Sequence, residues 1–147
     1  MKHSAIAWLL SAVVICCRVP AQEIATIPDE SILALHFEPL EYPQTARILH
    51  HQGAVVVKVS LDKSGRVIAA SAISGLQTLI PASVENAKKW RFQPNESNSA
   101  VIVYHFRFEG VCDQVCPSHF TFWPRNVATI TTGERIADHR GGEEPAR

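Results

Sequence analysis

The stretch "GAVVVKVSLDKSGRVIAASAIS", residues 53–74, constrains the fold of this 147-residue chain more than any other. Along it, one set of apolar residues falls on a single face: Val55, Val57, Val59 and Leu61. This period of two is typical of a β-strand with one buried side. The turn residues "DKSG" follow, and the alternation continues at Val67, Ala69 and Ser71. The stretch therefore predicts a β-hairpin.

Two helices and a third strand are predicted around this hairpin. Before it, Pro43 at a first helical position and Gly53 as a stop indicate a short helix, with Ala46 and Leu49 or His50 on one side. After it, "TLIPASVENAKKW" has apolar residues at helical spacing, with Thr78 placed to cap the helix. Then "AVIVYHFRFE" alternates again, which predicts a strand from Ala100 to Phe108.

These elements predict an α+β fold. It is a two-layer sandwich in which two helices cover one face of a mainly antiparallel sheet, in the order helix, strand, strand, helix, strand. Because a strand–helix–strand connection is right-handed and skips a position, the third strand is expected beside the first hairpin strand. The sheet then has three strands, or four if the chain beyond the third strand contributes another.

The segment "KKWRFQP" marks the junction between the second helix and the third strand. Trp90 and Phe92 can bury a large apolar area there. Arg91 is expected to point outward or to lay its stem along an aromatic ring. We interpret the cluster as packing at a helix end, not as a binding site.

The first 21 residues have the pattern of a secretory signal peptide, with an apolar run from Ala5 to Cys17 and the small residue Ala21 at a cleavage position. The run is shorter than the roughly 20 residues that span a bilayer, so an uncleaved inner-membrane anchor is the alternative. Cleavage predicts an exported, periplasmic protein that begins at Gln22. Without Lys2 and Arg18 the chain has 12 basic and 14 acidic side chains, which gives no electrostatic case for nucleic acid.

The patterns divide the chain into five segments. They are a signal peptide at 1–21, a leader at 22–38, a folded domain at 39–110, an extension with a cysteine pair and an extra strand at 111–132, and a flexible polar tail at 133–147.

Two cysteines in the extension, Cys112 and Cys116, are read as a local disulfide, because an even pair this close is oxidised in an exporting compartment. A redox site is the alternative, although three residues separate the cysteines where thioredoxin-like sites have two. His105 and His119 flank the pair without the spacing of a zinc finger.

Catalysis has no support in the sequence. The chain has no nucleophile elbow, no paired carboxylates and no glycine-rich phosphate loop. His50 and His51 are adjacent, so on a helix they point in different directions and do not form a metal site. We expect no enzymatic activity, no cofactor, no metal and no small-molecule substrate.

Taken together, three motifs resemble the carboxy-terminal domain of the TonB energy-transducing protein family. They are Tyr42-Pro43 with Ala46-Arg47 at the first helix, the hairpin sequence, and "NAKKWRFQP", where the family has an alanine-rich helix that ends in Trp-Arg-Phe or Trp-Arg-Tyr and then proline. The resemblance covers about Pro39 to Glu109. It implies a periplasmic domain that binds the Ton box of outer-membrane transporters and transmits force to them.

The resemblance also implies where a partner binds. In the family an extended peptide pairs with the exposed edge of the third strand, and the segment before the first helix also lies near the partner. Carried onto this chain, the partner-binding residues are Glu41, Tyr42, Pro43, Val101, Val103, His105 and Arg107. Membrane contact is then expected only through the partner, a transporter or another envelope protein, and a strand-exchanged homodimer stays an alternative.

This chain departs from the family pattern in two ways. No proline-rich spacer follows the amino-terminal segment, so the domain could bind without pulling. The segment from Cys112 to Thr131 could fold back as an extra strand and cover the edge that a Ton box would use. Two functions stay open: a protein-binding module for TonB-dependent transport, and an envelope structural domain whose edge is capped by its own carboxy terminus.

Overall fold

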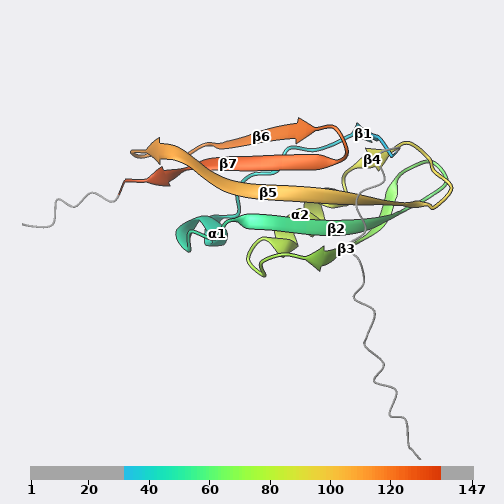
Figure 1. Cartoon of the computed structure of the whole chain (residues 1–147), viewed down its shortest axis with the longest axis horizontal. Coiled ribbons are helices and arrows are strands. Elements are labelled where there is room, and N and C mark those ends of the chain that lie inside the picture. The colour runs from blue at the N-terminus through green and yellow to red at the C-terminus, as the bar shows by residue number, and fades with distance from the viewer. Residues whose placement is uncertain (1–31, 137–147) are drawn as a thin grey trace, which may run out of the picture.

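The computed structural model describes residues 32–136, which form two helices and seven strands (Figure 1). Their bounds are β1 Ala34–His36, α1 Gln44–Ile48, β2 Gly53–Leu61, β3 Val67–Ser74, α2 Ile80–Ala87, β4 Arg91–Phe92, β5 Ser99–Cys112, β6 Ser118–Trp123 and β7 Val127–Arg135. The predicted signal peptide, most of the leader and the tail from residue 137 lie outside the described residues. Within the described part, neither helix is long and apolar enough to cross a membrane.

Five strands form one sheet in the order β3-β2-β5-β7-β6, and β1 pairs with β4 in a small second sheet. Neighbouring strands of the large sheet are antiparallel except β5 and β7, which run parallel. As the sequence predicts, β2 lies between β3 and β5. The predicted count of three or four strands was too low, because the extension contributes a complete hairpin of β6 and β7 (Figure 1).

The first hairpin turns at the predicted residues. One carboxylate oxygen of Asp62 accepts hydrogen bonds from the N–H groups of Ser64, at 2.8 Å, and Arg66, at 3.0 Å. Gly65 follows with a φ of +80°, a left-handed conformation that favours glycine. The inward residues of β2 are buried as predicted: Val55, Val57, Val59 and Leu61.

Beyond the turn, the predicted alternation on β3 is wrong after Val67. A register irregularity between the pairs of Ser60 and Leu61 shifts the side chains of β3 by one position. Ala69 and Ser71 are therefore exposed, whereas Ala70 packs against the core.

Both predicted helices form, and both are short. Ala46 on α1 is fully buried, but Leu49, which was predicted on the same side, is 52% exposed. On α2 the N-cap is Leu79, which makes no side-chain capping bond, so the prediction that Thr78 caps the helix is wrong. The hydroxyl of Thr78 instead bonds to Nδ1 of His51 at 3.0 Å, which joins the start of α2 to the end of the α1 turn.

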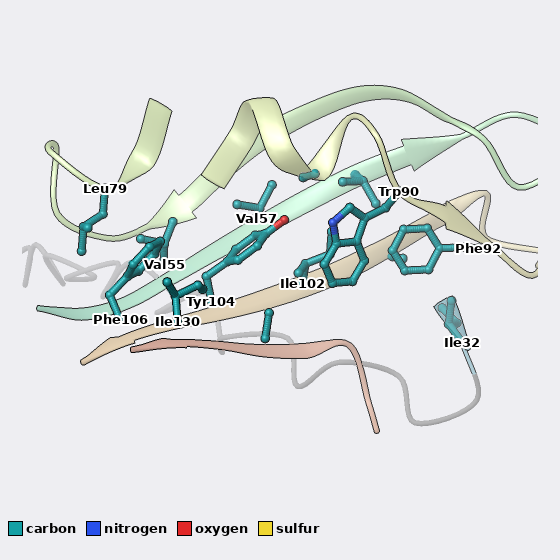
Figure 2. Close-up of a cluster of buried hydrophobic side chains, with 14 of the residues drawn as sticks. Ile32, Val55, Val57, Leu79, Trp90, Phe92, Ile102, Tyr104, Phe106 and Ile130 are labelled. Atoms are coloured by element: carbon teal, nitrogen blue, oxygen red, sulfur yellow. The ribbon is translucent and has the colours of Figure 1, made fainter. Parts of the chain in front are cut away.

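The core fills the space between α2 and the sheet (Figure 2). Trp90 and Phe92 are buried there and Arg91 is exposed, as the junction sequence predicts. Asn86 on α2 connects this core: its Oδ1 accepts hydrogen bonds from Nε1 of Trp90, at 2.8 Å, and from the hydroxyl of Tyr104, at 3.0 Å. Because the polar atoms of Trp90 and Tyr104 both bond to Asn86, the aromatic core can include them without the cost of leaving them unpaired.

Candidate functional site

The outer edge of β5 is the predicted partner-binding edge, and in the structure β7 occupies it. Val103 pairs with Val127, and the parallel register continues to Phe108 beside Thr132. The N–H of Val103 donates a hydrogen bond to the carbonyl of Asn126 at 3.0 Å. Of the two arrangements that the sequence left open, the structure has the covered edge.

Strand β7 is part of the hydrophobic core. Ala128, Ile130 and Thr132 alternate toward the helix side of the sheet and are buried. Ile130 lies in the same cluster as Tyr104 and Phe106 (Figure 2). Removing β7 would therefore expose apolar side chains of one continuous core. A peptide can reach the outer backbone of β5 along this register only by displacing a core strand.

The connection between β5 and β6 is fastened at several points. Cys112 and Cys116 form a disulfide with their Cα atoms 5.5 Å apart, in agreement with the predicted pair. The carbonyl of Cys116 accepts a hydrogen bond from the Arg47 guanidinium at 2.9 Å. The hydroxyl oxygen of Ser118 accepts another from the backbone N–H of Tyr42, also at 2.9 Å. These bonds tie the extension to α1 and to the segment before it.

Glu41, Tyr42 and Pro43 are the other predicted partner contacts, and they differ in exposure. Tyr42 is only 4% exposed, packs its ring against Phe108, and donates its hydroxyl to the carbonyl of His51 at 2.6 Å. Burial raises the pKa of Tyr42 to about 12. Tyr42 is thus a core residue in this structure, while Glu41 is exposed and Pro43 half-buried.

The side chains of the predicted β5 contacts alternate away from the core. Val101, Val103 and His105 are half-buried, and Arg107 is exposed. His105 and Arg107 line a shallow hollow of about 460 Å³ on this face, together with Trp123 of β6. These side chains are accessible even though the backbone edge of their strand is not. Their contact with a partner stays a prediction.

Strand β6 is now the edge of the sheet on this side, and β3 is the edge on the other. The sequence of β6, "SHFTFW", has no proline, lysine or acidic residue, and it pairs with β7 in continuous register. Natural edge strands usually carry charges, prolines or bulges that discourage pairing with other chains. Strand β3 has two register irregularities against β2. The regular, unprotected edge is therefore β6.

The described residues do not gather into a metal site. No group of three or more His, Cys, Asp or Glu residues that could hold a metal ion occurs within 32–136. His50 lies 3.3 Å from a carboxylate oxygen of Glu134, whereas His51 bonds to Thr78. The two adjacent histidines thus have different partners on different elements.

Residues 32–136 define a small α+β sheet domain in which the edge of β5 is covered by β7 and the outer edge of β6 pairs with no other described strand. Comparison with known proteins gives its family. Residues 38–109 match the family model described as Gram-negative bacterial TonB protein C-terminal. This segment of the chain belongs to the TonB carboxy-terminal family, as the sequence motifs indicated. The match ends within β5, so β6 and β7 lie outside it.

A solved structure is also similar. It is the solution NMR structure of the TonB carboxy-terminal domain of Pseudomonas aeruginosa, with 24% sequence identity and a TM-score of 0.43. The match covers 57% of this chain and 93% of that one. No curated protein matches the chain.

Two features of the site were not predicted from the sequence. The residues 119–122 and 127–131 both alternate, but the alternation does not reveal that they pair with each other and that the second enters the core. The signal for the turn between them is weak, because Arg125 and Asn126 both adopt a positive φ, of 70° and 59°, where glycine is the usual residue. The pairing could have been suggested only by the spacing of the two alternating runs.

Proposed function

We propose that this chain is a non-catalytic protein-binding module of the envelope, associated with TonB-dependent transport, that recognises an extended partner peptide at the open edge of β6. The observation that carries the proposal is the sheet order, in which β7 covers β5 and, within residues 32–136, no strand pairs with the outer side of β6. An unpaired strand edge presents backbone N–H and C=O groups that an extended peptide can satisfy. Membership of the TonB carboxy-terminal family supports the assignment to TonB-related transport.

The pairing of β7 determines which backbone N–H groups of β6 are free to bond to a peptide. Because the N–H of Val103 bonds to Asn126, alternate residues of β7 face β5 and β6 in turn. The residues of β7 that face β6 pair with His119, Thr121 and Trp123. The backbone N–H groups of Phe120 and Phe122 are then directed outward, and they are the donors that a peptide strand would use.

A binding experiment with a matched pair of variants tests this assignment. Phe122→Pro removes an outward N–H and also the aromatic ring that packs against Phe37. Phe122→Ala loses the same ring and keeps the N–H, so it is the control for packing. We expect a Ton box peptide of an outer-membrane transporter to bind the wild-type protein and Phe122→Ala, and to lose affinity for Phe122→Pro. Equal binding by both variants would contradict the β6 assignment.

Amide exchange with and without the peptide locates the contact. If the proposal is correct, the peptide slows exchange at Phe120 and Phe122 and leaves Val103, His105 and Arg107 unchanged. Slowing at Val103, His105 and Arg107 would instead mean that the peptide displaces β7 and uses the edge expected from the family.

A second function is favoured by one observation, the burial of Ala128 and Ile130 on the strand that covers β5. A core strand that permanently caps the edge suits an envelope structural domain that keeps the fold and binds no Ton box. This alternative predicts that none of the amides of β5 or β6 responds to the peptide, at peptide concentrations that saturate a TonB carboxy-terminal domain with an open edge.

A further inference from the structure

A cationic hollow lies at the end of α2, on the side of the molecule where β1 and β4 meet the first hairpin. Its volume is about 610 Å³. Four of the chain's 14 lysine and arginine residues line it, and within residues 32–136 no aspartate or glutamate does. The four are Arg66, Lys88, Lys89 and Arg91. The hollow is therefore locally positive on a chain with a formal net charge of zero.

Two of these cations face each other across a backbone bridge. Arg66 and Arg91 are directly paired, antiparallel residues. The bridge is held by the N–H of Phe92, which donates to the carbonyl of Gly65 at 2.8 Å. A Cβ atom on Gly65 would lie 1.9 Å from the carbonyl oxygen of Phe92, so only glycine allows this approach. Buried Trp90 and Phe92 hold Arg91 from either side, which fixes the position of its backbone.

The acidic groups nearby do not neutralise this pair. Lys88 forms an ion pair with Glu85 at 2.6 Å, on the exposed side of α2. Asp62 is engaged mainly by the hydroxyl of Ser64, which lowers the pKa of the Asp62 carboxyl, and the charge of Arg66 contributes only a smaller part of that lowering.

The positive charge of the pair is therefore not compensated by a salt bridge within the described residues. Among the ion pairs of the described residues, none includes Arg66, Lys89 or Arg91. Like charges on directly opposite residues destabilise a strand pair. A backbone bridge that brings two arginines together, with neither of them in a salt bridge to another described residue, is explained if an anion binds between them.

We propose that this hollow binds a phosphate group, and that the group is the headgroup of an anionic phospholipid at a membrane surface. Arginine binds phosphate through two parallel N–H donors, and the neighbouring Lys89 adds a point charge. Leu35 lines the hollow and is 62% exposed, and Leu33, two residues earlier in the chain, is 52% exposed. Exposed apolar side chains beside a cationic cluster suit the boundary between headgroups and acyl chains.

Binding to vesicles tests the site. The variant Arg66→Gln/Arg91→Gln removes the paired charges, and Lys58→Gln/Lys63→Gln removes two exposed charges that do not line the hollow. A basic residue near an anionic membrane contributes about 1 kcal/mol, which is roughly fivefold in affinity. On vesicles of phosphatidylcholine with phosphatidylglycerol, we expect the arginine variant to bind roughly 25-fold more weakly than the wild type and the lysine variant to bind nearly as well. Equal losses in both variants would overturn the site, as would wild-type binding that is the same on phosphatidylcholine alone.

Thermal melting separates a binding role from a structural one and a lipid from free phosphate. Because the arginines repel each other, Arg66→Gln/Arg91→Gln should melt no lower than the wild type in the absence of phosphate. A lower melting temperature would mean that the pair stabilises the fold, which contradicts the proposal. Inorganic phosphate, at constant ionic strength, should raise the melting temperature of the wild type and not that of the arginine variant. If phosphate does so but anionic vesicles do not bind, the ligand is a free phosphate compound and the lipid assignment is wrong.

Discussion

At the scale of single residues, Trp90 and Arg91 show how one short segment contributes both to the core and to the surface. Period-two alternation at the end of α2 sends Trp90 and Phe92 into the core and leaves Arg91 outside. The indole N–H of Trp90 is paired with Asn86, so the large ring can be buried without an unsatisfied donor. Burial of the two aromatic residues therefore positions the arginine between them at the surface.

Substitution of Trp90 should cost far more than substitution of its neighbour. Trp90 is 2% exposed, so Trp90→Ala should lower the free energy of unfolding by roughly 3 to 5 kcal/mol through the cavity it leaves. Arg91→Ala, the matched control on the adjacent exposed residue, should change it by less than about 0.5 kcal/mol. Denaturant unfolding measures both. A loss below about 1 kcal/mol for Trp90→Ala would show that the indole does not close the core.

The two tyrosines of the chain give a second test at this scale, because both are buried and hydrogen-bonded. Burial raises the pKa of Tyr42 to about 12 and raises the pKa of Tyr104 further. The unfolded chain loses these protons near pH 10 and the folded chain keeps them, so stability should fall as the pH rises from about 10 toward 12.

The ultraviolet absorbance of tyrosinate measures the ionisation of the two tyrosines directly. The native protein should show almost no tyrosinate at pH 10, whereas the protein in denaturant should be about half ionised there. If tyrosinate forms in the native protein with a midpoint near pH 10, at least one tyrosine is exposed to solvent. That result would contradict the packing of Tyr42 between α1 and the extension. The variant Tyr42→Phe assigns the remaining signal to Tyr104.

At the scale of elements, the disulfide loop determines how firmly β6 joins the sheet. The backbone carbonyl of Cys116 accepts a hydrogen bond from the Arg47 guanidinium, so the disulfide loop connects α1 to the extension. Closing so short a loop should contribute about 2 kcal/mol on the chain-entropy model. We expect Cys112→Ser/Cys116→Ser to unfold at a correspondingly lower denaturant concentration, with a normal fold at neutral pH. Unchanged stability would mean that the bond adds nothing to the hydrogen bonds around it.

Some of these elements follow from sequence and others do not, for a physical reason. A half-buried strand must alternate, so β2 with its inward residues, and the strand β5, were predicted from local pattern alone. The bulge after Val67 was missed, because one extra residue in a strand has no distinct composition. The two residues of β4 are too few to show a period.

The candidate sites were harder to predict than the elements. Pairing partners depend on tertiary packing, so the alternation of β7 indicated a strand but not that it would run parallel to β5. The cationic hollow joins a hairpin turn, a helix end and β4, and its charges come together only when the chain folds. By contrast, the alternation from Ala100 to Phe108 correctly predicted the strand β5, which carries most of the expected partner contacts.

At the scale of the whole molecule, the extension turns a three-stranded domain with an open edge into a five-stranded sheet with that edge inside it. The family match ends at residue 109, and the covering hairpin follows directly. Because β7 supplies Ala128 and Ile130 to the core, the cover and the domain should fold and unfold together. A partner that leaves this sheet intact cannot pair with the side of β5 that β7 covers.

Native-state amide hydrogen exchange of the isotope-labelled protein tests the covered edge most directly. The amides of Val103, His105 and Arg107 face β7. The amide of Tyr104, on the same strand, faces β2 and serves as the internal standard. We predict that the three amides exchange as slowly as that of Tyr104, through global unfolding, while the outward amides of Phe120 and Phe122 exchange much faster. If Val103, His105 and Arg107 instead exchange as fast as Phe120 and Phe122, while Tyr104 stays protected, then β7 does not cover β5 in solution and the edge is open.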